Sequence, residues 1–441
     1  MGPVDEGSDE LAARAGLKLA AGGRRAFHRA DMAAAANLLT RAVGMLGPDE
    51  PQRREALLLL GAAFSEIGKP DQAETAFHET IDLAEAAGDQ AREWRARLDL
   101  SLLRARFDPG PTSAEDLLRE AREAISAFEE LGDEQALAAA WRSQAQALYW
   151  LGELGAAAAA AEQAVGFAER VGDRHEQTRG LQLLAASLEE GPTATLEAIQ
   201  RCEEILARAG DDRFLVAAIQ RKLATLYRMQ GELGEARRLA DNAVEIYEDL
   251  GLPVALAAAL GFERAGVSWV AGDLEVAERD LRRAVDLLTA IDEKGLLSTI
   301  AINLAALLCE EGKEEEAEHF LQVSEETAAA DDWVSQSGIK SVRASLLARQ
   351  GEFEAAITLA REALAEAEGR DNQLWRGLRR VSLAEVLVLA GEADEAKHLL
   401  GEAINLFETK GNLILAERTR RTLAGLEKDG SLPARPPSGG L

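Results

Sequence analysis

Residues that favour β-sheets are scarce in this sequence. Aromatic residues make up 5% of its 441 positions, and only 11 prolines interrupt the chain. The apolar share is ordinary at 47%, but alanine and leucine dominate it and β-branched residues are few. Alanine and leucine favour helices, whereas strands draw on β-branched and aromatic side chains. We therefore expect an all-α protein.

Cysteine and histidine are too few and too scattered to build a common metal site. Cys202 and Cys309 lie far apart and belong to no CxxC pair, which also excludes a disulfide framework. No HExxH motif is present, and the histidines are dispersed: His28, His78, His175, His319 and His398. We expect Cys202 to fill the core, a reducing cytoplasm as the location, and no metal or cofactor.

Long hydrophobic runs and a net positive charge are also missing. No stretch reaches the roughly 18 uninterrupted apolar residues of a membrane-spanning helix, and the start, MGPVDEGSDE, is acidic, unlike a signal peptide. The formal charge of −28 repels nucleic-acid backbones and anionic membranes. We expect neither nucleic acid nor membrane as a partner of this chain alone.

Nucleotide-binding and nucleophile motifs are absent from the sequence. The nearest match to GxxxxGK(S/T) is GAAFSEIGKP at 61–70, which has six residues between its glycines and a proline where serine or threonine is required. Serine, histidine and aspartate form no nucleophile motif. The sequence therefore predicts no enzymatic activity.

A repeat of about 40 residues fills the chain. In the unit RMQGELGEARRLADNAVEIYEDLG at 228–251, a marker glycine, Gly231, is followed by small residues five and twelve positions later. Six further units carry the same triplet: Gly68, Ala73, Thr80; Gly152, Ala157, Ala164; Gly272, Ala277, Ala284; Gly312, Ala317, Ser324; Gly351, Ala356, Ala363; and Gly391, Ala396, Ala403. Weaker copies start at Ala30, Thr112 and Glu190, which gives ten units separated by steps of 38 to 44 residues.

The pattern within each unit predicts a helical hairpin. Most units have another small residue seven positions before the marker, such as Ala145, Ala224 and Ala305. Small residues let two helix backbones approach closely, while the larger apolar residues between them form a stripe at helical spacing. The marker glycine suits the left-handed position that ends the first helix, and acidic residues follow at the start of the second.

The unit resembles the tetratricopeptide repeat (TPR). Stretches such as LAALLCEEGKEEEAEHFLQVSEETA and LAEVLVLAGEADEAKHLLGEAINLF show the family's small residue, Gly-(Asp/Glu)-x-x-x-Ala and final alanine. The usual repeat has 34 residues, so both helices here are expected to be about one turn longer. The resemblance covers residues 10–427 and implies a right-handed superhelix whose first helices line a concave groove.

A narrower resemblance concerns the two ends of the array. GRRAFHRADMAAAANLLTRAV and AINLFETKGNLILAERTRRTLAGL are similar to the C-terminal repeat region of large bacterial regulators. In those proteins an ATP-binding signalling module is joined to a nucleotide cyclase or a DNA-binding domain. This resemblance implies that the chain is a sensing or partner-binding arm, or a stand-alone relative.

The edges and joints of the array are also predicted. Residues 1–9 and 428–441 are expected to be disordered, and the helix from Asn412 to Glu427 is expected to cap the array. Two joints are irregular, RFDPGPTS at 106–113 and EEGPTAT at 189–195. They are either unusual hairpin turns or a bend that divides the array.

The inward positions of the first helices give the candidate partner-binding residues. These are Arg142, Gln146, Tyr149, Trp150, Arg221, Thr225, Arg228, Trp269, Asn303 and Arg349. Arginine and aromatic residues are typical binding hot spots, and an arginine in an acidic groove suits a ligand carboxylate. The alternative for Trp150 and Trp269 is packing against the second helix of the same hairpin.

These observations favour a non-catalytic scaffold that binds a partner protein or peptide in the concave groove. The alternative is the sensing arm of a bacterial signalling regulator, an ATPase, nucleotide cyclase or transcription regulator, whose catalytic or DNA-binding module lies outside this chain. The carboxylate clamp of chaperone cofactors is not reproduced. Asn303 occupies one clamp position, but Phe262 and Gly266 stand where lysine and asparagine are required.

Overall fold

The molecule is a stack of antiparallel helical hairpins. The structure, a computed structural model, describes residues 4–108 and 113–429, and these contain helices and no strand. The first five hairpins are α1 (Val4–His28) with α2 (Met32–Val43), α3 (Pro51–Glu66) with α4 (Pro70–Ala87), α5 (Gln90–Phe107) with α6 (Ala114–Leu131), α7 (Glu134–Trp150) with α8 (Leu154–Val171), and α9 (Arg174–Glu190) with α10 (Thr195–Arg208).

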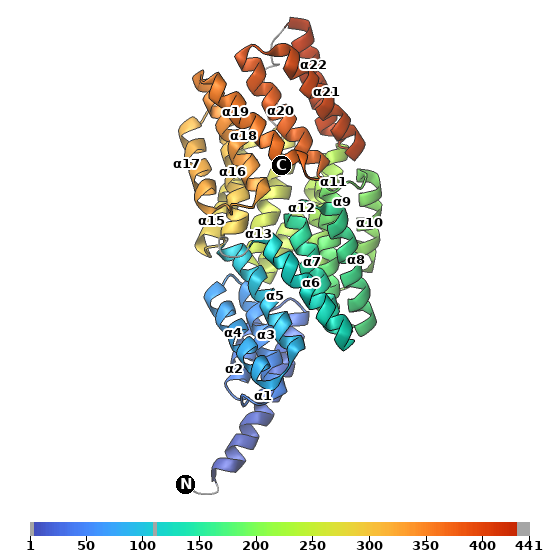
Figure 1. Cartoon of the computed structure of the whole chain (residues 1–441), viewed down its shortest axis with the longest axis vertical. Helices are drawn as coiled ribbons and strands as arrows, with labels where there is room; N and C mark the ends of the chain where they lie inside the picture. The colour runs from blue at the N-terminus through green and yellow to red at the C-terminus, as the bar shows by residue number, and fades with distance from the viewer. Residues whose placement is uncertain (1–3, 109–112, 430–441) are drawn as a thin grey trace.

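The second half of the array repeats this arrangement. Its hairpins are α11 (Arg213–Gln230) with α12 (Leu233–Leu250), the interrupted helix α13 (Pro253–Ala258), η1 (Ala259–Arg264) and α14 (Ala265–Ala271) with α15 (Leu274–Ala290), α16 (Lys294–Glu310) with α17 (Glu314–Thr327), α18 (Trp333–Gln350) with α19 (Phe353–Glu368), and α20 (Gln373–Ala390) with α21 (Ala393–Lys410); the last helix is α22 (Leu413–Asp429). Figure 1 shows α1 at one end of the molecule and α20 to α22 at the other. The predicted all-α array of ten hairpins and a final helix is confirmed.

The marker glycines end the first helices in the left-handed conformation. All seven glycines of the strong copies have φ between 72° and 88°, which is costly for residues with a Cβ atom. Ala30, the marker of a weak copy, also has a positive φ of 58°. Glu190 instead belongs to the end of α9, and Thr112 lies outside the described residues. The spacing therefore located the hairpin turns even where the glycine is missing.

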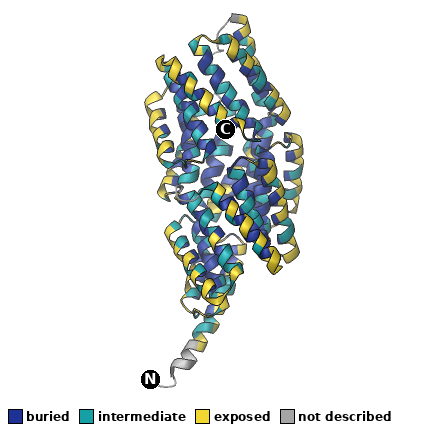
Figure 2. Cartoon of the chain, in the orientation of Figure 1, coloured by how far each residue is buried: buried dark blue, intermediate teal, exposed yellow. Residues whose placement is uncertain are grey.

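The small residues of the repeat are contact points between helices. Ala236 and Ala243 are fully buried, and so are the residues at the same two positions of the other strong copies. Where glycine replaces alanine the approach is closer still, because a Cβ atom on Gly61 would lie 2.5 Å from a ring carbon of Phe77. Figure 2 shows the result, with buried residues facing the inside of the stack and exposed residues along its outer edges.

The ends and joints of the array can be compared with the predictions made from the sequence. Helix α22 begins after Asn412, whose side chain accepts a hydrogen bond from the backbone N–H of Leu415. Helix α1 starts at Val4, inside the segment 1–9 for which disorder was expected; residues 1–3, 109–112 and 430–441 lie outside the described residues. The joint after α5 resumes with a capping box between Ser113 and Asp116.

One helix is long and apolar enough by composition to cross a membrane. It spans Pro253–Ala271, but 67% of it is buried inside the protein. Its middle carries Glu263 and Arg264, which pair with Arg221 and Asp280 of neighbouring helices. We interpret it as a core helix of the array.

Candidate functional site

The first helices of the array enclose a cavity of about 530 Å³, which we call the chamber. Most of its lining comes from α3, α5, α7, α9, α11, the α13–η1 helix, and the starts of α16, α18 and α20 with the loops that precede them. Second helices contribute little, chiefly Phe77, Ala114 and Leu154. The hairpin geometry therefore places first helices around an interior space, as the repeat pattern predicted.

The chamber is closed by contacts between distant repeats, which we call the seam. The backbone N–H of Ala114 donates to Asp331, 217 positions later, with an N to O distance of 2.9 Å. The N–H of Leu154 donates to Asp371, again 217 positions later, at 2.8 Å. Both separations equal about five and a half repeats. The turn inside each of these two hairpins therefore contacts the loop that follows the hairpin five units further along the chain. The superhelix thus closes on itself.

The best-defined part of the seam is at the start of α8. Both carboxylate oxygens of Asp371 accept backbone hydrogen bonds, from Leu154 and Gly155, at 2.8 Å each. Arg370 donates to the carbonyl oxygen of Leu151 at 2.6 Å, and the indole of Trp333 donates to that of Trp150 at 3.1 Å. A carboxylate at a helix N-terminus satisfies free N–H groups and interacts favourably with the helix dipole.

A buried lysine forms the next part of the seam. The ammonium group of Lys410, at the end of α21, donates to the carbonyl oxygens of Leu188, Gly191 and Thr193 at 3.1, 2.7 and 2.8 Å. Leu188 lies in the last turn of α9, and Gly191 and Thr193 belong to the irregular joint after it, so the joint is a docking point for the C-terminal repeats. Burial lowers the pKa of Lys410 to about 8.

Charged side chains of both signs line the chamber. Its carboxylates are Glu66, Asp99, Glu176, Glu189, Glu190, Glu263, Glu293, Asp331 and Asp332. Its cationic side chains are Arg95, Arg106, Arg142, Arg179, Arg221, Lys222 and Arg228. Carboxylates therefore outnumber the cations, nine to seven, among the described lining residues.

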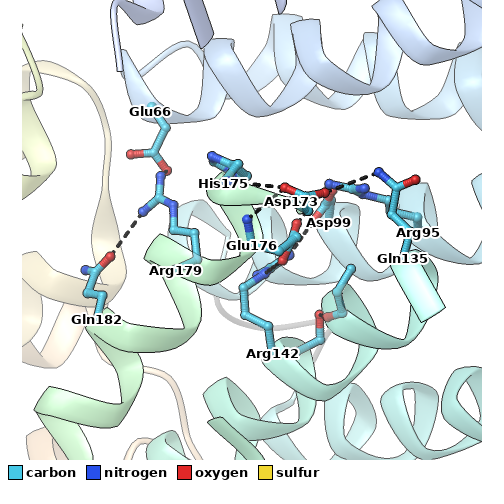
Figure 3. Close-up of polar contacts among 12 residues, drawn as sticks. Glu66, Arg95, Asp99, Gln135, Arg142, Asp173, His175, Glu176, Arg179 and Gln182 are labelled. Atoms are coloured by element: carbon cyan, nitrogen blue, oxygen red, sulfur yellow. Dashed lines mark hydrogen bonds and ion pairs between the residues drawn. The ribbon is translucent and has the colours of Figure 1, made fainter. Parts of the chain in front are cut away.

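Glu176 is the centre of one buried network (Figure 3). It accepts from Arg95 at 2.8 Å and from Arg142 at 2.7 Å, and Arg142 also donates to Asp99 at 3.0 Å. Burial alone would raise the pKa of Glu176, but the two arginines outweigh it and lower this pKa to about 2. Burial has the opposite effect on the adjacent His175, whose pKa falls to about 3, so its imidazole is neutral at physiological pH.

The other arginines and the lysine of the chamber also have internal partners. Arg179 lies 2.7 Å from Glu66, also visible in Figure 3, and Arg221 forms two bonds to Glu263 at 2.9 and 3.0 Å. Lys222 donates to Glu189 at 2.8 Å. The pairs of Arg221 and Lys222 link neighbouring first helices, while Arg179 and Glu66 link α9 to α3.

Glu190 has only neutral hydrogen-bond partners, as do Asp331 and Asp332 among the chamber carboxylates. It accepts a short hydrogen bond from the hydroxyl of Tyr149 and a long one, 3.5 Å, from the amide of Asn372. Burial and the neighbouring carboxylate of Glu189 raise the pKa of Glu190 to about 7. Glu190 is only partly buried, which fits a side chain that faces the chamber.

The structure brings seven of the ten predicted binding residues to the chamber. They are Arg142, Gln146, Tyr149, Trp150, Arg221, Thr225 and Arg228. Internal carboxylates, however, already lie at the positions where Arg142 and Arg221 were expected to receive a carboxylate from a ligand. These arginines hold neighbouring helices together in the structure.

Trp269, Asn303 and Arg349 do not line the chamber, and their placement corrects the sequence-based projection. Trp269 is 2% exposed and its indole donates to Glu310 at 2.9 Å, so it packs in the core. The π-helical segment η1 precedes it, and one extra residue in a helical turn rotates everything after it by roughly 100°. Asn303 is also buried, and Arg349 lies 3.8 Å from Glu314 of the adjoining second helix.

Sequence reasoning missed several chamber residues, among them Arg95, Glu176, Glu263, Trp333 and Trp375. A signal was available for Glu176 and Arg179, which stand three positions apart on one face of a first helix, as inward residues do. No such signal marked Trp333 and Trp375, because they reach the chamber at the seam, from repeats that are distant in the sequence.

Neither metal nor thiol chemistry gains support from the site. No group of three or more histidine, cysteine, aspartate or glutamate side chains in the described ranges could hold a metal ion. Cys202 is fully buried at the second small position of its repeat, as expected of a residue that fills the core. Cys309 is buried too and lies away from the chamber.

Comparisons with known proteins agree with this architecture. A family model described as the MalT-like TPR region matches residues 184–416. None of the curated proteins compared with the chain matches it. Among solved structures, the chain is similar to a Rap protein complexed with competence and sporulation factor, with a TM-score of 0.55 and 13% identity over 86% of this chain and 98% of that one.

Two further structures show the same fold at low identity. Cut9, in the APC/C heterotetramer Cut9-Hcn1, has a TM-score of 0.54 and 15% identity over 95% of this chain and 82% of that one. The human IFIT1 dimer with m7Gppp-AAAA has a TM-score of 0.50 and 16% identity, covering 90% of this chain and 87% of the other. At such identities the likeness concerns the helical-repeat fold alone.

Proposed function

The chain belongs to the family of MalT-like TPR regions, and we propose on this basis that it is a non-catalytic scaffold that binds a peptide segment of a partner in the chamber. Stacked helical repeats present extended concave surfaces for binding, while specificity lies in the side chains that line them. The cytoplasm is the location that we propose.

The chamber is the observation that carries this proposal. Its volume of about 530 Å³ lies within the roughly 300 to 1,000 Å³ typical of ligand sites, and it combines aromatic walls with charged groups. A space of this size suits a short segment and not a folded domain. Among the similar structures, the Rap protein is complexed with competence and sporulation factor, which supports a ligand for this fold without identifying one for this chain.

Nucleic acid is not part of the proposal, although human IFIT1 is seen with capped RNA. That likeness concerns the fold, and the net charge of −28 opposes binding of a phosphate backbone. Most cationic side chains of the chamber are also paired with carboxylates of the chain itself.

The proposal is tested by closing the chamber without touching its charged groups. Ala255 lines the chamber and is partly exposed, so Ala255→Trp should fill part of the space. Ala159 is exposed on α8 and does not line it, which makes Ala159→Trp the matched control. The retention of short random peptides by the immobilised chain would be measured by mass spectrometry.

Wild type and the control should retain peptides, while Ala255→Trp should lose most of them at unchanged helix content and melting temperature. Equal retention by Ala255→Trp would place binding outside the chamber. No retention by the wild type would exclude a peptide-binding role.

A second candidate function is the sensing arm of a signalling regulator, and the seam favours it. A ligand in the chamber would contact residues on both sides of the seam, such as Trp150 and Trp333. Binding would then stabilise the closed superhelix and transmit a signal to an attached module. Hydrogen exchange at the N–H groups of Leu154 and Gly155 should slow when peptide binds; unchanged exchange would argue for a passive scaffold.

A further inference from the structure

We infer that the end of the chamber around Glu190 binds an organic cation, the ammonium or guanidinium group of the bound peptide. This inference rests on the proposed function, because it specifies the chemistry of the segment that the chamber receives. Three independent features of the lining support it.

The first feature is the balance of charge. Six cationic side chains of the chamber, Arg95, Arg106, Arg142, Arg179, Arg221 and Lys222, lie within 4 Å of a carboxylate of the chain. Burial lowers the pKa of the seventh, Arg228, while the nearby carboxylates of Glu189 and Glu263 favour its protonated form. An anionic ligand would have to displace these carboxylates, whereas a cationic ligand meets a surplus of negative charge.

The second feature is the environment of Glu190. No lysine or arginine of the described residues lies within ion-pairing distance of its carboxylate, whose partners are Tyr149 and Asn372. Lys222 and Lys410 favour its ionised form only through space, because they are bonded to Glu189 and to backbone carbonyl oxygens, so a ligand ammonium or guanidinium would supply a direct counter-charge. The raised pKa of Glu190 agrees with this reading.

The third feature is the set of aromatic rings beside that carboxylate. Tyr149 bonds Glu190 directly and Trp150 follows it in the chain. Trp333 bonds the carbonyl oxygen of Trp150, and its ring centroid lies 6.3 Å from that of Trp375. Aromatic faces attract organic cations, so the rings and the carboxylate select the same kind of ligand.

Two of these rings, Trp333 and Trp375, already contact cations of the chain itself. The guanidinium groups of Arg370 and Arg379, which do not line the chamber, lie over Trp333 and Trp375 at 5.7 and 4.9 Å from the ring centroids. Tyr149 and Trp150 carry no such contact with a described residue, and both line the chamber. They are therefore the rings that we assign to the ligand.

A hydroxyl on the neighbouring helix α11 provides a separate indication of a ligand. Thr225 is 4% exposed and lines the chamber, and its hydroxyl forms no hydrogen bond with any residue of the described ranges. A hydroxyl that faces the chamber without a protein partner is available to a ligand. A donor from the ligand would pair with the oxygen of Thr225, as an ammonium or guanidinium does.

The experiment uses the full chain and random peptides as the probe. One peptide mixture has acetylated N-termini and a second has free N-termini, so that side-chain cations are distinguished from the terminal amine; spermidine is added as a competitor that represents free amines. Glu190→Gln keeps the size of the side chain and removes its charge. Glu197→Gln, on the exposed surface of α10 in the same hairpin, is the matched control.

Peptides with lysine or arginine, or with a free N-terminus, should be enriched about tenfold by the wild type and by Glu197→Gln, as expected for one charge-assisted contact. Glu190→Gln should lose this enrichment with no fall in its melting temperature. Peptide retention without a preference for cations, or with one that Glu190→Gln leaves unchanged, would overturn the inference and leave the proposed function standing. No retention at all would remove both.

Discussion

Asp371 caps the helix that begins at Leu154, although the two residues stand 217 positions apart in the chain. The bond joins one turn of the superhelix to the next and belongs to the seam that closes the chamber. The stability of the array therefore depends on contacts between distant repeats as well as between neighbours. In an open solenoid, contacts between neighbouring repeats alone supply that stability.

Replacement of Asp371 by alanine should loosen the seam. The variant leaves the N–H groups of Leu154 and Gly155 without their acceptor, so the free energy of unfolding should fall by about 1 to 2 kcal/mol, the usual cost of a lost helix cap. Urea denaturation measures this change, and hydrogen exchange should accelerate at the two amides. Asp211→Ala, at an exposed aspartate on the surface of the array, should have little effect; equal losses in both variants would contradict a role for the seam.

Glu176→Gln should be strongly destabilising. The substitution leaves Arg95 and Arg142 buried without their main counter-charge, and the loss of one partner of a buried pair costs about 3 to 5 kcal/mol. Folding lowers the pKa of Glu176 from 4.5 to about 2, so its contribution is complete above pH 4.5 and disappears as the pH falls toward 2. Denaturation experiments should show that the difference in free energy of unfolding between wild type and variant shrinks over that pH range. A constant difference would be inconsistent with an origin in the ionised carboxylate of Glu176.

Glu190→Gln should act in the opposite direction. Folding raises the pKa of Glu190 from 4.5 to about 7, so the folded state binds more protons between these values and the wild type loses stability as the pH rises through them. The variant lacks this loss and should be more stable than the wild type at pH 8 by about 3 kcal/mol, the equivalent of about 2.5 pKa units. At pH 4 the two proteins should have similar melting temperatures.

Two threonines provide a contrast between ligand binding and folding. Thr178 donates to Asp212 at 2.6 Å, so Thr178→Val should lower the free energy of unfolding by about 1 to 2 kcal/mol. Thr225 has no such bond within the described residues, so Thr225→Val should leave stability nearly unchanged and reduce peptide retention. A large loss of stability in Thr225→Val would show that its hydroxyl has a structural role.

Glycines on helix faces should differ according to the space around them. A Cβ atom on Gly377 would lie 2.4 Å from the ring of Phe407, so Gly377→Ala should destabilise the protein by about 1 to 3 kcal/mol through overpacking. Gly234 has no neighbouring atom within 4 Å, and Gly234→Ala should stabilise it by about 0.5 to 1 kcal/mol. Thermal denaturation of the two variants tests whether helix contact explains the small residues of the repeat.

Much of the fold could be predicted because its signals are local. Gly231 marked a helix end, and Ala236 and Ala243 marked contacts within the hairpin and with its neighbours, all within one unit of the chain. The candidate site was predicted less completely. Arg142 and Tyr149 were placed correctly on an inward face, while Trp269 was misplaced because the π-helical segment before it has no clear signature in the sequence.

The sequence by itself determined the helices, the hairpin turns and the inward faces, because the spacing of small and apolar residues acts over distances of one repeat. Only the tertiary structure decided that the array closes on itself, because closure depends on small rotations between repeats that accumulate over five hairpins. That closure brings Asp371 to Leu154 and Lys410 to Gly191, and it places Trp333 beside Trp150. The tertiary structure also decided that Arg142 forms an ion pair with Glu176, whereas Glu190 forms none with a cation of the described chain. These pairings arise between helices and not within them.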